Sequence, residues 1–182
     1  KKRSIFLKGL LELPRLYSEV LSQNKDIKKL CKIFTRSHSV LYLGRDVLYP
    51  IALEGALKLK EISYLHAEGY ASGELKHGPI ALIDKSMSVV ALNPSTKVFE
   101  KTLSNLEEVK ARRGKIILLT DEKGKKLSKN LTKSIFQLPK CSDFLAPILY
   151  SLPLQLIAYY TALDKGTDVD QPRNLAKSVT VE

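Results

Sequence analysis

Three charged side chains recur on one side of the helix predicted for residues 49–65. Glu54, Lys58 and Glu61 fall within about 60° of one another at 100° per residue, whereas the rest of the circumference is mostly apolar or small. A surface helix normally has a broad polar face. The narrow stripe is either an ordinary i,i+4 ion pair worth about 0.2–0.5 kcal/mol, or a set of groups whose apolar surroundings shift their pKa values toward proton transfer. The pattern alone leaves both interpretations open.

A segment with two histidines follows this helix. Ser72 or Gly73 is predicted to begin a short helical turn that ends at His77. Histidine is the side chain best suited to acid–base chemistry near neutral pH, but a lone histidine is more often structural, and we expect that of His66. The three histidines of the chain form neither an HExxH motif nor an i,i+4 pair, so no metal site and no cofactor is expected.

The end of the chain offers another amine. Gly166 and Pro172 argue against a continuing helix after residue 165. Chain termini are usually frayed, but a tail that docks into a cleft could instead deliver Lys177 to a substrate. Lysine forms Schiff bases with carbonyl compounds when its pKa is lowered.

The order of the predicted elements indicates an α/β fold. Short apolar runs, typical of buried parallel strands, alternate with helical patterns, which predicts one three-layer α/β/α sandwich. Ligands bind such sheets at the carboxyl ends of the strands, so the site is expected at that edge, although the loop after Gly44 has no Ser/Thr cluster to cradle a phosphate. The expected strands are residues 39–44, 88–92, 115–120 and 134–138, and the expected helices are 4–23 (broken or restarted near Pro14), 25–34, 49–65 and 97–113.

Composition narrows the possible partners. A net charge of +11 permits anionic ligands, but the lysine run at residues 123–133 has no interleaved aromatic residue, so we expect a solvated loop and no nucleic-acid surface. The two cysteines form no CxxC pair, which fits a reduced, cytoplasmic setting. Residues 144–163 carry no charge and could span a bilayer. Because they include Pro147 and Pro153, we favour a core or interface helix bent near Pro153, and no membrane partner.

Three motifs together resemble the glutamine–fructose-6-phosphate aminotransferase family. The similarity covers nearly the whole chain in the family's order and spacing, and its last motif coincides with the end of family members. The resemblance implies the SIS (sugar isomerase) fold with a parallel five-stranded sheet. The motifs are LEGALKLKE at residues 53–61, GELKHGP at 73–79 and DQPRNLAKSVTVE at 170–182.

The resemblance also implies roles for individual residues. Lys177 matches the lysine that forms a Schiff base with the open-chain ketose, and Glu61 matches the carboxylate that moves a proton between C1 and C2. His77 matches a histidine linked to ring opening, which the family contributes across a dimer interface. The other residues expected at the substrate are Lys58, Glu54 and Ala176.

The same resemblance implies an organisation and a function. Residues 1–24 are expected to be a helical linker from a preceding SIS half, 25–166 the SIS domain and 167–182 the tail. The complete enzyme would make glucosamine 6-phosphate from fructose 6-phosphate and glutamine-derived ammonia, as a homodimer. This sequence lacks the glutaminase domain and the phosphate-binding first SIS half, so the isolated chain is expected to be inactive. The alternatives are a non-catalytic sugar-phosphate-binding SIS regulator and a stand-alone aldose–ketose isomerase, but neither a helix-turn-helix nor a phosphate loop is found.

Overall fold

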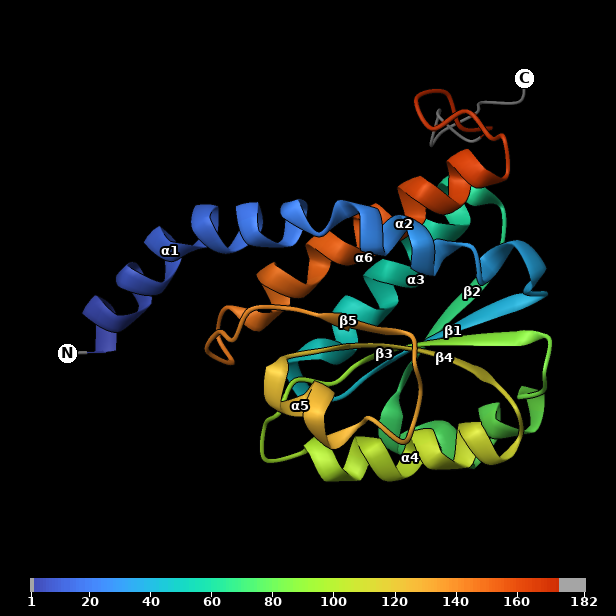
Figure 1. Ribbon diagram of the computed structural model, residues 1–182, viewed down its shortest axis with the longest axis horizontal. Helices are drawn as coiled ribbons and strands as arrows, with labels where there is room; N and C mark the ends of the chain where they lie inside the picture. The colour runs from blue at the N-terminus through green and yellow to red at the C-terminus, as the bar shows by residue number, and fades with distance from the viewer. Residues whose placement is uncertain (1, 174–182) are drawn as a thin grey trace, which may run out of the picture.

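A parallel sheet with helices on both faces makes up the computed structural model, which describes residues 2–173 (Figure 1). All strand pairs are parallel and the strand order is β2-β1-β3-β4-β5, so the expected three-layer sandwich with a five-stranded sheet is confirmed. The strands are β1 (Ser39–Gly44), β2 (His66–Ala71), β3 (Met87–Leu92), β4 (Lys115–Thr120) and β5 (Ile135–Gln137).

The helices divide into two layers. One face of the sheet packs against α1, α2, α3 and α6, and the other packs against α4 and the short helix η3. The α-helices are α1 (Lys2–Ser22), α2 (Asn24–Cys31), α3 (Tyr49–Ser63), α4 (Phe99–Ala111), α5 (Glu122–Leu127) and α6 (Ala146–Asp164); the 3₁₀ helices are η1 (Phe34–Arg36), η2 (Asp46–Leu48), η3 (Ser72–His77) and η4 (Pro79–Leu82).

Two sequence-based expectations about these elements are wrong. The lysine run is not a loop throughout, because its first part forms α5, capped by the Asp121 carboxylate, which accepts a hydrogen bond from the Gly124 N–H at 2.8 Å. Helix α1 is not broken at Pro14 but continues through it, and Figure 1 shows the helix bending part-way along its length. Proline removes one hydrogen bond and crowds the preceding turn, which bends a long helix without ending it.

The strand β2 is missing from the elements expected on sequence grounds. It is one of the two edge strands of the sheet, and most of its side chains are half-buried, so it lacks the continuous apolar run that marks the inner strands. Its backbone pairs with β1 in register from Ser39↔His66 to Gly44↔Ala71.

The uncharged stretch near the C-terminus forms α6 and lies in the core, as expected. Leu149, Tyr150 and Leu154 are each no more than 1% exposed, and Pro153 lies within the continuous helix. None of the helices within residues 2–173 is both long and apolar enough to cross a membrane.

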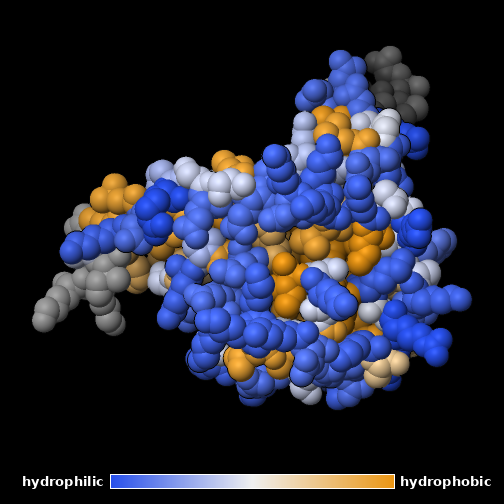
Figure 2. Space-filling model, viewed as in Figure 1, coloured by the Kyte–Doolittle hydropathy of each residue, from blue (hydrophilic) through white to orange (hydrophobic). Residues whose placement is uncertain are grey.

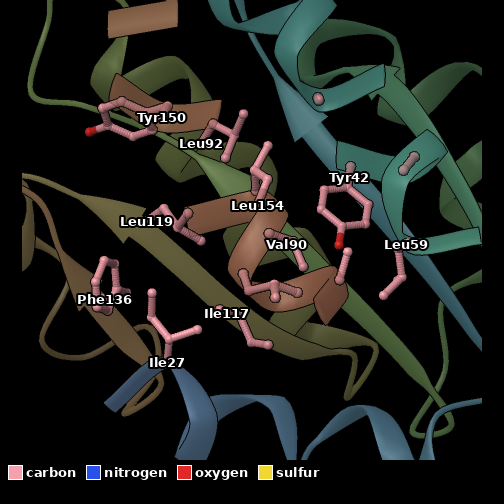
Figure 3. Close-up of a cluster of buried hydrophobic side chains, with 14 of the residues drawn as sticks. Ile27, Tyr42, Leu59, Val90, Leu92, Ile117, Leu119, Phe136, Tyr150 and Leu154 are labelled. Carbon is pink, nitrogen blue, oxygen red and sulfur yellow. The ribbon is translucent and has the colours of Figure 1, made fainter. Parts of the chain in front are cut away.

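A close approach between α3 and its neighbours depends on Gly55. A Cβ at this position would lie 2.7 Å from Leu154 Cδ1 and 2.9 Å from Tyr42 Cε1. Figure 3 shows Tyr42 and Leu154 within the same cluster of buried side chains, together with Leu59 of α3. The absence of a side chain therefore lets α3 sit directly on β1 and α6.

We expect Gly55→Ala to destabilise the protein. Alanine is normally the better helix former, but here its methyl group would overpack the core, at a cost of about 1–3 kcal/mol. Urea unfolding measures the change. The penalty should shrink when Leu154→Ala is added, since that substitution makes room for the methyl group; a more stable Gly55→Ala protein would contradict the packing described.

Candidate active site

Helix α3 carries the charged stripe and presents it to solvent. Its buried side consists of Ala52, Gly55, Ala56 and Leu59, which face the sheet and α6. The rest of the mostly apolar circumference is nevertheless not buried throughout. Two leucines beside the stripe, Leu53 and Leu57, are 43% and 42% exposed. The outer face of α3 thus combines charges with exposed apolar surface.

The three charged groups of the stripe contact one another. Lys58 Nζ lies 2.8 Å from Glu61 Oε2 and 3.8 Å from Glu54 Oε1, so the lysine bridges two carboxylates. All three side chains are roughly one-third to two-fifths exposed. At this exposure solvent screens the ion pairs, so they contribute little to stability. The arrangement holds Glu61 in a defined position rather than holding the fold together.

The carboxylates of the stripe shift the pKa of its lysine. The hydrogen bond to Glu61 raises the pKa of Lys58, with smaller contributions from the charges of Glu61 and Glu54. Of the two interpretations left open, the raised pKa favours the ion pair at Lys58, because it stabilises the charged form of the amine. Lys58 can orient a carboxylate or stabilise negative charge, which leaves proton transfer to the carboxylates.

The stripe runs along α3 toward the edge of the sheet opposite to the expected one. The α3 helix begins after the carboxyl end of β1 and ends at Ser63, shortly before His66, which pairs with Ser39 at the start of β1. Glu61, in the last turn of α3, is therefore near the amino ends of the strands. The sequence argument placed the site at the carboxyl edge because isolated doubly wound sheets bind ligands there.

The carboxyl edge itself holds a hollow of about 160 Å³ beside Arg45, Asn93 and Lys97. The guanidinium of Arg45 is already engaged, since it donates hydrogen bonds to Thr102 Oγ1 at 3.3 Å and Asn105 Oδ1 at 3.2 Å. This edge therefore offers no ready cradle for a phosphate in the loop after β1.

The segment that leads to the chain end is attached to the end of α3. Thr167 Oγ1 donates a hydrogen bond to the Ile62 carbonyl oxygen at 2.7 Å, and the Arg173 N–H donates one to the Tyr64 hydroxyl at 2.8 Å. Figure 1 shows the chain after α6 turning back beside that helix end. Ala176 and Lys177 lie outside the described residues. The last described residue, Arg173, is bound to Tyr64, which follows Glu61 by three positions in the sequence.

His77 is not brought together with Glu61 within one chain. It ends η3, which follows the carboxyl end of β2 and is anchored on the α4 side of the sheet by the buried Leu75. The turn begins at Ser72 and ends at His77, as expected. The His77 side chain is 72% exposed and its Nδ1 lies 2.8 Å from Glu74 Oε2, which leaves Nε2 directed elsewhere.

His66 lies at the start of β2 and is also exposed. Its Nε2 is 3.6 Å from Glu68 Oε1, and its side chain is 67% exposed. Sequence reasoning missed Tyr64, because no motif or spacing in the sequence singles it out. In the structure it ends α3 with a φ of 56°, an uncommon conformation for an aromatic residue.

Comparison with known proteins shows which family this chain belongs to. Residues 33–165 match the SIS domain family. The chain belongs to the SIS domain family. A glutamine–fructose-6-phosphate aminotransferase [isomerizing] of Bartonella quintana is 58% identical over 177 residues, which cover 97% of this chain and 29% of the relative's length. The SIS chain thus spans less than a third of that relative.

Solved structures agree with this placement. The C-terminal domain of glucosamine-fructose-6-phosphate aminotransferase from Francisella tularensis superimposes with a TM-score of 0.84 at 45% identity, over 91% of this chain and 46% of that one. The sugar isomerase domain of an RpiR transcription factor from Sphaerobacter thermophilus has a TM-score of 0.73 at 11% identity, covering 88% and 90% of the two chains. The second likeness shows the shared SIS fold alone.

We expect the charge of Glu61 to control the titration of Lys58. Glu61→Gln removes the leading cause of the raised pKa and should lower the Lys58 pKa more than Glu54→Gln does, because the Glu54 contact is 1 Å longer, at 3.8 Å against 2.8 Å. Side-chain NMR of Lys58 measures both shifts. Since folding raises this pKa, the pair's contribution to stability is present at neutral pH and is lost as the pH rises through the folded pKa. Equal shifts in the two variants would contradict the geometry.

Proposed function

We propose that this SIS domain is the second isomerase half of an enzyme that converts fructose 6-phosphate to glucosamine 6-phosphate with ammonia from glutamine. The observation that carries the proposal is the meeting of two features at the end of α3: the Glu54–Lys58–Glu61 stripe and the attachment of the chain's last described residues beside it. The 58% identity to an aminotransferase of this kind supports it.

The proposed chemistry uses an imine to make a C–H bond acidic. The amine of Lys177 attacks the C2 carbonyl of the open-chain ketose, and loss of water gives a ketimine. Ammonia then displaces the lysine at C2. Because the imine draws electrons from the neighbouring carbon, Glu61 can remove a proton from C1 while the imine nitrogen gains one, which gives an enolamine. Glu61 then returns its proton to C2, and the C1 hydroxyl loses its proton as the aldehyde forms, which yields the amino aldose. One carboxylate therefore serves both halves of the proton shift.

Lys58 supports this carboxylate without exchanging protons. Its charge holds the Glu61 carboxylate through the 2.8 Å contact and can stabilise the enolamine oxygen or a substrate oxygen that becomes negative. Glu54 balances that charge from the other side at 3.8 Å. Ala176, next to Lys177, is proposed to contact the sugar through its backbone.

The rest of the pocket is proposed to come from outside this chain. The loop after β1 offers no phosphate cradle, so a first SIS half of the full-length enzyme would bind the sugar phosphate, and a glutaminase domain would supply ammonia. We place the enzyme in the cytoplasm, which suits its two unpaired cysteines: burial raises the pKa of Cys31 to about 12 and that of Cys141 to about 11, so both thiols stay protonated and unreactive.

We expect Lys177→Ala and Glu61→Gln to abolish synthesis in the full-length enzyme by blocking different steps. With fructose 6-phosphate and borohydride, the Glu61→Gln enzyme should still form a reduced sugar adduct at Lys177, because the imine forms before the proton shift. The Lys177→Ala enzyme should form none. Mass spectrometry of the peptide and a product assay give the two readouts.

The matched control for this experiment is Glu68→Gln, which removes a carboxylate on the neighbouring edge strand and should preserve turnover. Near-normal synthesis by either active-site variant would remove the assigned role. Robust turnover of fructose 6-phosphate with glutamine by residues 1–182 alone would contradict the two-part pocket.

We also propose a homodimer in which His77 of one subunit serves the site of its partner. Within one chain His77 and Glu61 lie on opposite faces of the sheet, so they can share a site only across an interface. Full-length His77→Ala and Glu61→Gln enzymes should each be inactive, but hybrid dimers formed after mixing and subunit exchange should recover up to about a quarter to a half of the sites, since one composite site would again have both groups. Absence of any recovery in verified hybrids would contradict the shared site.

A further inference from the structure

The segment after α6 is guided to the end of α3 by successive contacts. Gly166 adopts a φ of +68°, which turns the chain out of the helix. Thr167 then donates its hydroxyl to the Ile62 carbonyl, one of the oxygens that the last turn of α3 leaves without a helical partner. The tail therefore begins its course already attached to α3.

A tight turn then directs the chain toward Tyr64. The Asp168 carboxylate accepts hydrogen bonds from the backbone N–H groups of Asp170 at 2.9 Å and Gln171 at 3.1 Å. This side-chain turn needs no other part of the protein. It brings the following residues, Pro172 and Arg173, back across the end of the helix.

Tyr64 meets this segment with two parts of its side chain. Its hydroxyl accepts the Arg173 N–H at 2.8 Å, and its ring lies beneath the Arg173 guanidinium, with the guanidinium carbon 4.4 Å from the ring centroid. Tyr64 itself ends α3 in a left-handed backbone conformation, with φ of 56°. One residue thus holds both the main chain and the side chain of Arg173.

We propose that Tyr64 and Arg173 are positioning residues that keep the Schiff-base lysine at the site. Tyr64 follows Glu61 by three residues and Arg173 precedes Lys177 by four, and four residues reach at most about 14 Å. Anchoring Arg173 on Tyr64 therefore confines the lysine to the neighbourhood of the carboxylate with which it must act. The inference rests on the proposed function, because it assigns a purpose to the tail only if Lys177 attacks the sugar.

The contact itself is tested first, in this chain and without any activity. Tyr64→Phe keeps the ring but removes the only acceptor that the described residues provide for the Arg173 amide. Hydrogen exchange of that amide by NMR should accelerate several-fold. The Thr167 amide, which donates to the Ala162 carbonyl, serves as an internal reference and should be unchanged, as should both amides in the control variant Tyr49→Phe.

The positioning role is tested in the full-length enzyme. Tyr64→Leu removes both contacts and should lower kcat by about ten- to a hundredfold through misplacement of the amine. KM should change by a smaller factor, and the amount of Lys177 adduct trapped by borohydride at saturating sugar should fall. Arg173→Lys keeps the N–H and a positive charge and should retain most of the activity. Equal urea midpoints for the wild-type and Tyr64→Leu enzymes would show that the fold is intact and that the lost activity comes from lost positioning.

The outcomes distinguish this inference from the proposed function. Unchanged exchange of the Arg173 amide in Tyr64→Phe would show that the contact does not hold in solution and would overturn the inference. Altered exchange with a wild-type kcat in Tyr64→Leu would overturn it as well, while an inactive Lys177→Ala enzyme would leave the proposed function standing. An active Lys177→Ala enzyme would end both.

Discussion

The close packing of α3 on the sheet and on α6 determines what the candidate site can be. Gly55 lets the helix approach Tyr42 and Leu154, and this contact fixes the rotation of α3 about its axis. Once that side is buried, Glu54, Lys58 and Glu61 must face outward. Their half-exposed ion pairs are too weak to impose this orientation, so the stripe is placed by burial of the opposite side, and the flanking Leu53 and Leu57 are exposed for the same reason.

The parallel topology then decides at which edge of the sheet the chemistry lies. A helix that joins two parallel strands runs back from the carboxyl edge to the amino edge, so groups in the last turn of α3 are remote from the loops that bind ligands in an isolated sheet of this type. Along the helix, Glu61 is about 20 Å from the loop after β1. In the proposed function, a sugar at Glu61 lies far from the loop after β1, which is why its phosphate is proposed to bind in another SIS half.

The two faces of the sheet separate the remaining residues of interest. Leu75 anchors η3 in the α4 layer, whereas α3 and the tail belong to the α6 layer. In the proposed reaction His77 therefore serves Glu61 of another subunit, whereas the tail serves Glu61 of its own chain, because Thr167 and Arg173 are bound at the end of α3. Assembly and tail attachment are thus independent requirements of the proposed reaction, and each can be disturbed without the other.

The sequence by itself determined the inner strands, the turn at Ser72–His77 and the shared face of Glu54, Lys58 and Glu61, because each depends on local apolar runs, helix breakers or the 100° period of a helix. It did not reveal β2, since this edge strand pairs with β1 through its backbone and has no apolar run, with most of its side chains half-buried. Only the tertiary structure decided the edge of the sheet near which Glu61 lies and the contact between Tyr64 and Arg173. That last pair is 109 residues apart, and no local period encodes a contact that exists only after α3 and α6 have packed together.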